Sequence, residues 1–308
     1  MSAPAPRAPE LALGVSTPSP LAVWLMACRP KTLPAAVVGV LVGSACAWQQ
    51  GFFRALPSLA ALLGALLLQI GSNFANDVFD FEKGADNAAR VGPTRAVQAG
   101  LISPASMKRG MLIVFALASL VGVYLASVAG PLIVGIGLAS IVAAIAYTGG
   151  PYPLGYHGLG EVFVFLFFGL VSVTATVYLN GAQVGGVALA LACKVGALAS
   201  AILVVNNVRD HETDRESGKR TLVVRLGRSA GVLEYAGLLS IGYLIPIALV
   251  LTGSLSGWTL LPLLMLPRAA QLFRELGTER DARLNRTLAG TAQLLLLDGV
   301  LTCAGLLL

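Results

Sequence analysis

Charged side chains are scarce in this chain of 308 residues, of which 12% are Asp, Glu, Lys or Arg and 56% are hydrophobic. A soluble domain has about 25% charged residues. No charged residue lies between Arg109 and Glu161, or between Glu161 and Lys194. Apolar stretches of about 20 residues have the length of a membrane-spanning helix. The alternating pattern of a membrane β-barrel is absent. The sequence therefore predicts an all-α, polytopic membrane protein.

Cysteine and histidine are also few, with four cysteines and two histidines in the chain. The cysteines are scattered through apolar runs, without the spacing of a metal site or a disulfide framework. His157 and His211 are isolated, and we interpret them as structural or solvated side chains. The acidic and basic residues are therefore the candidates for chemistry.

Nine apolar runs are long enough, or nearly long enough, to be membrane spans. Pro262 and Pro267 interrupt the eighth run, and proline breaks helices. Residues 1–20 are rich in Ala, Pro and Ser and lack the basic start and apolar core of a signal peptide. We predict a disordered tail over residues 1–20 and one transmembrane domain over 21–308, with a bundle of about nine spans around a central cavity. The runs are 33–48, 56–76, 111–128, 132–147, 162–179, 187–205, 238–251, 258–266 and 288–307.

The net charge of +6 comes from basic residues in the loops between these runs. It does not indicate nucleic-acid binding, because loop Lys and Arg report the orientation of a membrane protein. With the N-terminus inside, only Arg54 lies in an outside loop, and Lys194 lies within a span. We therefore predict a multi-pass protein of the cell (inner) membrane whose N-terminus faces the cytoplasm.

A first acidic cluster ends the second apolar run. Asn76, Asp77 and Asp80 are three or four residues apart, so their side chains point roughly one way on a helix. Basic residues follow the cluster closely. They are Lys83, Arg90 and Arg95.

A second cluster with the same order follows the sixth run. Asn206, Asp210 and Asp214 are spaced by four residues and share a helix face. An ordinary charged loop between two spans is the alternative interpretation of this stretch. Carboxylates at the membrane, however, are costly and usually functional. The basic residues beside this cluster are Arg209, Arg215, Lys219 and Arg220.

Two clusters at the same end of the membrane suit a diphosphate ligand. Mg²⁺ prefers oxygen ligands and takes some of them from phosphate. Facing carboxylate clusters can hold Mg²⁺ against a diphosphate while Arg and Lys cover its remaining oxygens. In a membrane protein, this pattern favours a lipid diphosphate whose tail lies in an apolar cavity.

These motifs resemble those of the UbiA-type intramembrane prenyltransferases. The first motif is Asn76-Asp77-x-x-Asp80 with Arg90 and Arg95 after it, and the second is Asn206-x-x-Arg209-Asp210-x-x-x-Asp214. The segments 29–35 and 150–161 are similar to the branch of 1,4-dihydroxy-2-naphthoate polyprenyltransferases of menaquinone synthesis.

The resemblance implies a Mg²⁺-dependent transfer of a polyprenyl group from its diphosphate to 1,4-dihydroxy-2-naphthoate, with loss of CO₂. It implies catalytic roles for Asp77, Asp80, Asp210 and Asp214, and metal binding by these four with Asn76 and Asn206. It also implies that a set of basic side chains binds the diphosphate. That set is Arg29, Lys31, Lys83, Arg90, Arg95, Arg209, Lys219 and Arg220.

Two departures from the wider family bear on this interpretation. Gly84 stands where many members have a third Asp, which leaves the role of nearby Asp86 open. The loop after the fourth run lacks the Lys usual in the hydroxybenzoate branch, which favours the naphthoate acceptor. The alternatives are a 4-hydroxybenzoate acceptor, a phytyl donor, and a membrane transporter with no catalytic role. Neither the prenyl chain length nor the oligomeric state follows from the sequence.

Overall fold

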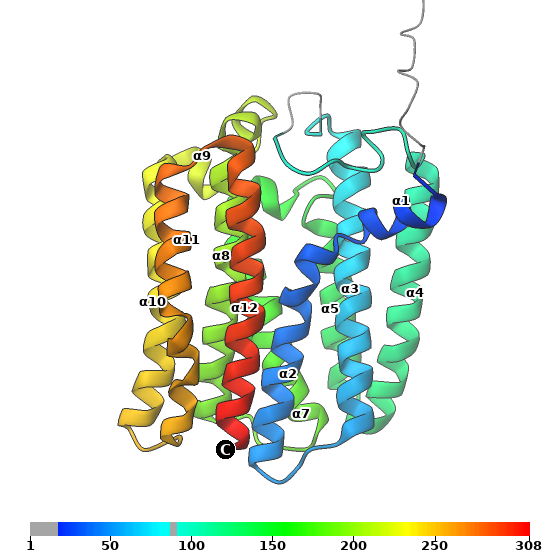
Figure 1. Cartoon of the computed structure of the whole chain (residues 1–308). Helices are drawn as coiled ribbons and strands as arrows, with labels where there is room; N and C mark the ends of the chain where they lie inside the picture. Colours follow the sequence, from blue (N-terminus) through cyan, green and yellow to red (C-terminus); the bar gives the residue numbers. More distant parts are fainter. Residues whose placement is uncertain (1–17, 87–90) are drawn as a thin grey trace, which may run out of the picture.

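The computed structural model describes residues 18–86 and 91–308, and every regular element within them is helical (Figure 1). Residues 1–17 of the predicted tail 1–20 and Arg90 lie outside the described residues. The elements are α1 Pro20–Ala27, η1 Pro30–Thr32, α2 Leu33–Gln49, α3 Ala55–Glu82, α4 Pro104–Ala129, α5 Leu132–Ala146, η2 Leu154–Tyr156, α6 Gly160–Val164, η3 Phe165–Val171, α7 Ser172–Leu179, α8 Gly186–Glu216, α9 Leu222–Leu226, α10 Arg228–Leu251, η4 Gly257–Met265, α11 Leu266–Thr278, η5 Asp281–Arg283 and α12 Leu284–Leu307.

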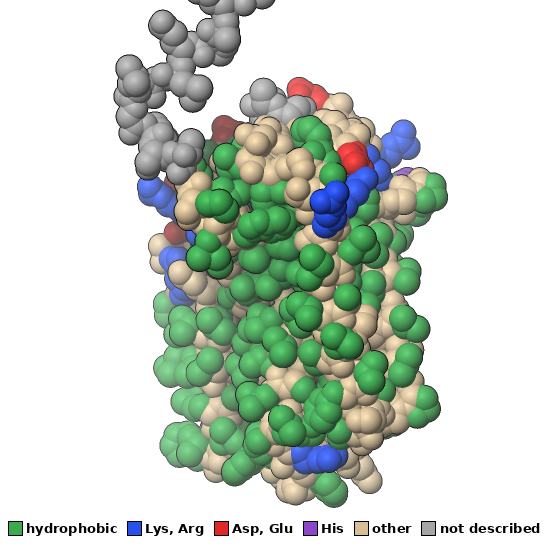
Figure 2. All heavy atoms as spheres, turned by 90° about the vertical axis from the view of Figure 1, so that its right-hand side faces the viewer, with side chains coloured by type: hydrophobic (Ala, Val, Ile, Leu, Met, Phe, Trp, Pro, Cys, Tyr) green, Lys and Arg blue, Asp and Glu red, His purple; other side chains and the backbone are tan. Residues whose placement is uncertain are grey.

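Long helices form an upright bundle, but the predicted count of nine spans is not confirmed. Within the described chain, seven helical stretches are long and apolar enough to cross a membrane, and α5 is a shorter apolar helix. The predicted eighth span consists of the 3₁₀ segment η4 followed by α11, because Pro262 lies inside it. Figure 2 shows hydrophobic side chains covering one face of the bundle, with most charged side chains at one end.

The segment before α2 lies across the end of the bundle rather than along it (Figure 1). Ser19 caps α1 by accepting a hydrogen bond from the Ala22 N–H at 3.3 Å. The chain then turns sharply at Arg29, whose φ of 51° lies in the left-handed region that is unfavourable for a residue with a Cβ. This turn places the stretch 29–32 at the mouth of the bundle interior.

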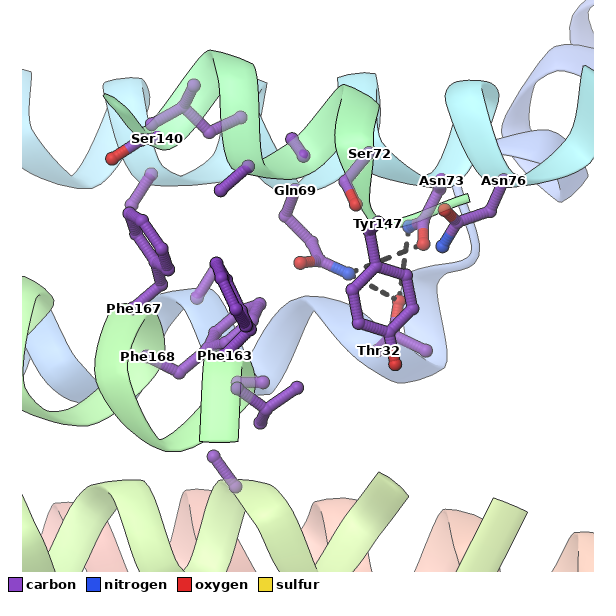
Figure 3. Close-up of a pocket in the computed structure, with 18 of the residues that line it drawn as sticks. Thr32, Gln69, Ser72, Asn73, Asn76, Ser140, Tyr147, Phe163, Phe167 and Phe168 are labelled. Carbon is purple, nitrogen blue, oxygen red and sulfur yellow. Dashed lines mark hydrogen bonds between the residues drawn. The ribbon is translucent and has the colours of Figure 1, made fainter. Parts of the chain in front are cut away.

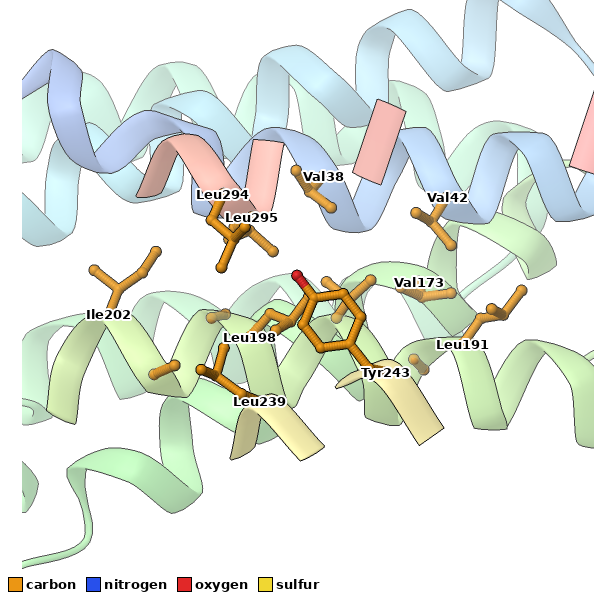
Figure 4. Close-up of a cluster of buried hydrophobic side chains, with 14 of the residues drawn as sticks. Val38, Val42, Val173, Leu191, Leu198, Ile202, Leu239, Tyr243, Leu294 and Leu295 are labelled. Atoms are coloured by element: carbon orange, nitrogen blue, oxygen red, sulfur yellow. The ribbon is translucent and has the colours of Figure 1, made fainter. Parts of the chain in front are cut away.

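Helices α2, α8, α10 and α12 enclose the larger hydrophobic core (Figure 4). A second core joins α1, α3 and α4. Close approach of η3 to α8 requires glycine, because a Cβ on Gly169 would collide with the backbone of Gly196. The seven residues of η3 form a π-helical segment inside the span. Such segments are often found at functional sites.

Lys194, which the sequence places within a span, forms an ion pair with Asp298 between α8 and α12. Each residue is 1% exposed. Lys194 also donates to the Thr302 hydroxyl at 3.1 Å, and that hydroxyl donates to the Asp298 carbonyl at 2.8 Å. Pairing explains how two charges are tolerated deep in an apolar bundle.

Candidate active site

The first acidic cluster lies at the C-terminal end of α3, where the structure separates its two aspartates. The Asp77 carboxylate accepts the backbone N–H groups of Ala96 and Val97, both at 3.1 Å. Asp77 is 1% exposed and is not among the residues that line the cavity. The Asp77 oxygens therefore hold the 91–103 loop against α3, and metal binding by Asp77 stays a prediction.

Asp80 faces the interior and is surrounded by donors. Its Oδ1 accepts the Tyr156 hydroxyl at 2.8 Å, and its Oδ2 lies 3.3 Å from Arg95 Nη2. The Nε of Arg95 lies 3.1 Å from Asp86 Oδ2, so the buried Arg95 bridges Asp80 and Asp86. Asp86 thus joins the first cluster through Arg95.

The second cluster lies at the C-terminal end of α8. Arg209 donates from Nε and Nη2 to the two oxygens of Asp210, at 2.7 and 2.5 Å. The same guanidinium donates to Asn206 Oδ1 at 2.7 Å and to Asn285 Oδ1, on α12, at 2.8 Å. Such bidentate pairing holds Asp210 in one orientation.

Lys219 joins the two clusters. Its Nζ lies 3.7 Å from Asp80 Oδ1 and 3.5 Å from Asp214 Oδ1. It also lies 4.9 Å from the centre of the Tyr156 ring, within the range of a cation–π contact. The motifs are more than 120 residues apart in sequence, yet one ammonium group contacts both. They therefore form one site, at the end of the bundle where the four predicted runs between them (the third to the sixth) place both motifs.

The remaining predicted basic residues divide into two groups. Arg29 and Lys31 line the cavity, as Arg95, Arg209 and Lys219 do. Lys83 donates instead to the carbonyls of Thr148 and Gly150, at 2.7 and 3.1 Å. Arg220 is exposed and contributes its backbone N–H to the Tyr156 carbonyl at 2.8 Å. The structure therefore does not bring the Lys83 and Arg220 side chains into the cavity lining.

Three polar residues of the site were not predicted from the sequence as site residues. Tyr156 lies in the segment 150–161, which resembles the family, and that resemblance was the one feature of the sequence that could have indicated a role in the site. Asn285 lies in what looked like a basic loop, and nothing in its surroundings marked it. The Thr148 hydroxyl donates to Asn76 Oδ1 at 2.9 Å, which fixes the Asn76 amide.

Burial raises the pKa of the Tyr156 phenol, and the neighbouring Asp80 carboxylate raises it further. Tyr156 therefore remains a neutral donor to Asp80 at physiological pH. Burial also lowers the pKa of Lys83, while the negative charge of Asp80 opposes that shift. The site thus has one neutral donor and several cations around its carboxylates.

The carboxylate and amide oxygens of the two clusters suit Mg²⁺ only in combination with phosphate oxygens. In residues 18–86 and 91–308, no group of three or more His, Cys, Asp or Glu side chains could hold a metal ion. Asp80 and Asp214 nevertheless flank one cation, the Lys219 ammonium. Mg²⁺ is commonly bound by one or two carboxylates together with substrate phosphates. The residues present fit that mode.

A cavity of about 870 Å³ opens beneath the two clusters. Asn76, Asp80, Asn206, Asp210 and Asp214 line its polar end. Figure 3 shows Phe163, Phe167 and Phe168 around its interior, with polar side chains of α3 on another wall. The arrangement can bind an anion at the polar end and an apolar chain below it.

The chain is similar to known proteins over most of its length. The model of the UbiA prenyltransferase family matches residues 36–293. The chain is 45% identical over 267 residues to "1,4-dihydroxy-2-naphthoate octaprenyltransferase" of Escherichia coli (strain K12), covering 84% of this chain and 86% of the relative. It is 39% identical over 270 residues to the protein of that name from Mycobacterium tuberculosis (strain ATCC 25618 / H37Rv), covering 87% and 89%.

The fold is also shared with solved structures. A UbiA homolog from Archaeoglobus fulgidus bound to DMAPP and Mg²⁺ superposes with a TM-score of 0.65 at 15% identity. That comparison covers 91% of this chain and 99% of the other. The family match spans most of the described bundle, including both acidic clusters. This chain therefore belongs to the UbiA prenyltransferase family.

Proposed function

We propose that this protein transfers a polyprenyl group from an allylic polyprenyl diphosphate to 1,4-dihydroxy-2-naphthoate. The products are diphosphate, CO₂ and demethylmenaquinol, the reduced form of demethylmenaquinone. The observation that carries the proposal is the contact of Lys219 with both Asp80 and Asp214 at the mouth of an apolar cavity. The names of the relatives, which are octaprenyltransferases acting on this acceptor, support the choice of substrate.

In this mechanism the two clusters bind the diphosphate. Asp80, Asp210 and Asp214, with Asn76 and Asn206, would hold Mg²⁺, which supplies a Lewis acid for the diphosphate oxygens. Lys219 would exchange its carboxylate contacts for phosphate oxygens as the donor enters. Asp77 anchors the 91–103 loop against α3. The clamp stabilises the charge that develops as the allylic C–O bond breaks.

The acceptor supplies the electrons for the new bond. The electron pair of the broken C–O bond leaves with diphosphate, and the ring carbon that bears the carboxylate attacks the allylic carbon with its π electrons. Loss of the carboxylate as CO₂ returns an electron pair to the ring and restores aromaticity. The apolar cavity excludes water that would otherwise trap the allylic cation as an alcohol.

A substrate panel tests this proposal. Purified protein in detergent is incubated with Mg²⁺, one prenyl diphosphate, and either 1,4-dihydroxy-2-naphthoate or 4-hydroxybenzoate. We expect prenylated product with the naphthoate and little with the benzoate, since the loop 147–161 lacks Lys. Phytyl diphosphate and polyprenyl diphosphates of several lengths define the donor. If product formed with the benzoate alone, the assignment of dihydroxynaphthoate as the acceptor would be wrong. If no pair of donor and acceptor released pyrophosphate, the transporter alternative would be favoured.

The orientation that we propose places both clusters and the N-terminus on the cytoplasmic side of the cell (inner) membrane. Basic residues of the loops concentrate at the end of the bundle that holds the site, which favours that orientation. A Ser217→Cys variant should therefore resist an impermeant thiol reagent applied to intact cells. Efficient labelling from outside would reverse the orientation.

Lys219 and Arg220 are adjacent basic residues for which the structure supports different effects. We expect Lys219→Ala to raise the KM for the prenyl diphosphate about 10- to 100-fold, the range for losing a hydrogen bond to a charged group. Arg220→Ala is the matched control and should change that KM less than about twofold, because its side chain is exposed. Equal losses in the two variants, measured by pyrophosphate release, would contradict the role of Lys219.

A further inference from the structure

A row of polar side chains continues down α3 from the acidic cluster into the cavity. Gln69, Ser72 and Asn76 recur at helical spacing, so they share one face of α3. All three line the cavity. Figure 3 shows them directed from α3 into the space that the Tyr147 ring also faces. At 1.5 Å per residue, Gln69 lies about 16 Å along the axis from Asp80.

Hydrogen bonds hold the Gln69 side chain in one orientation. Its Nε2 donates to Thr32 Oγ1 and to Asn73 Oδ1, both at 3.3 Å. Asn73, which is 2% exposed, donates from Nδ2 to the Cys28 carbonyl at 2.9 Å and to Thr32 Oγ1 at 3.2 Å. The Thr32 hydroxyl donates to the Arg29 carbonyl at 3.0 Å. The segment 28–32 therefore fixes the amide of Gln69.

This network uses the donors of Gln69 and leaves its acceptor for another molecule. Among the described residues, none donates a hydrogen bond to Gln69 Oε1, and the Ser72 hydroxyl has no hydrogen-bond partner. Both groups belong to residues that line the cavity. An amide oxygen held in a fixed position, with its donors already used, suits a ligand that brings a hydroxyl donor.

An isoprenoid tail would not suit this wall. Covering an amide oxygen with hydrocarbon and no hydrogen bond carries a free-energy penalty. The apolar wall formed by α4 and α5 suits a tail better, with Val121, Leu125, Ile133 and Ile136 lining the cavity there. The apolar wall therefore favours the isoprenoid tail, and the polar wall favours a part of the substrates that carries hydrogen-bonding groups.

Aromatic residues complete the polar side of the cavity. Tyr147 and Phe163 line it, and aromatic rings pack favourably by offset or edge contacts. Arg29 and Lys31, which belong to the segment that fixes Gln69, also line the cavity. In this region a planar ring could place its hydroxyl near a hydrogen-bond acceptor, Gln69 Oε1. Its faces would pack against aromatic rings, and its carboxylate would lie near cationic side chains.

We propose that Gln69 and Ser72 form the binding site for the aromatic acceptor, with Gln69 Oε1 accepting a hydrogen bond from a ring hydroxyl. Thr32 and Asn73 act as positioning residues that orient the Gln69 amide. The ligand class is a hydroxylated aromatic acid. This inference rests on the proposed function and deepens it, because it assigns the residues that select the acceptor.

Ligand binding tests the inference separately from catalysis. Full-length protein in detergent is titrated, by fluorescence of the ligand, with 1,4-dihydroxy-2-naphthoate, 1-hydroxy-2-naphthoate and 4-hydroxy-2-naphthoate. We expect Gln69→Leu to weaken binding of the dihydroxy compound about tenfold, as for loss of one buried hydrogen bond. The effect should fall below about twofold for the analogue that lacks the contacted hydroxyl. The KM for prenyl diphosphate should change less than about twofold.

Gln271→Leu is the matched control, since Gln271 is exposed and donates to Glu275 Oε1 on the surface of α11. It should leave all three dissociation constants unchanged. Unchanged binding in Gln69→Leu would overturn the inference. Equal weakening of all three ligands would also overturn it, because a structural effect would not depend on one hydroxyl. If wild-type protein binds the naphthoates with this Gln69 dependence but releases no pyrophosphate, the proposed function fails while the acceptor site stands.

Discussion

Asp80→Asn and Asp214→Asn should each reduce Mg²⁺-dependent pyrophosphate release about 10²- to 10³-fold, the range for removing one electrostatic contact in a transition state. Each change keeps the size of the side chain and removes the charge that Mg²⁺ requires. Lys219 contacts both carboxylates, so the two residues belong to a single clamp. The double variant should therefore be little worse than either single variant.

The measurement is pyrophosphate release against Mg²⁺ concentration for the two single variants and the double variant. Asp77→Asn is an informative comparison, because the Asp77 carboxylate accepts backbone N–H groups and does not line the cavity. We expect its effect to appear mainly as lower thermal stability, with the Mg²⁺ dependence retained. Near wild-type release by Asp214→Asn, with Asp80 intact, would show that the second cluster is only a charged loop.

Lys194→Met should destabilise the folded protein by about 3–5 kcal/mol, the usual effect of removing one partner from a buried ion pair. The change leaves the Asp298 carboxylate uncompensated between α8 and α12. Replacing both charges with apolar side chains, Lys194→Met with Asp298→Leu, removes that penalty. The double variant should regain most of the lost stability.

Thermal unfolding in detergent measures this effect. The control is Lys108→Met, since Lys108 Nζ and Glu82 Oε1 are 2.7 Å apart but both side chains are about two-fifths exposed, at 43% and 39%. An exposed pair contributes about 0–1 kcal/mol, so its loss should shift the midpoint only slightly. A double variant at 194 and 298 that is less stable than Lys194→Met alone would contradict the account.

Many features of this protein follow from local sequence patterns. Long apolar runs predicted the membrane helices, because hydrocarbon requires every backbone group to be hydrogen-bonded within the segment. The Asn/Asp spacing predicted two clusters on helix faces, and the even number of runs between them predicted that they meet at one end. These patterns depend on neighbours three or four residues apart, which a sequence displays directly. Pro262 interrupts the eighth predicted run, and there the structure has a 3₁₀ segment.

Only the tertiary structure decided which side chains meet. Asp77 and Asp80 look equivalent in sequence, but the packing of the 91–103 loop against α3 turns Asp77 to backbone N–H groups and leaves Asp80 for Arg95, Tyr156 and Lys219. Lys194 and Asp298 are 104 residues apart, and Arg209 and Asn285 are 76 apart. Pairing over such separations depends on how α8 and α12 pack, and no local spacing encodes that packing. The Gln69 network has the same origin, because the turn at Arg29 brings Thr32 beside α3.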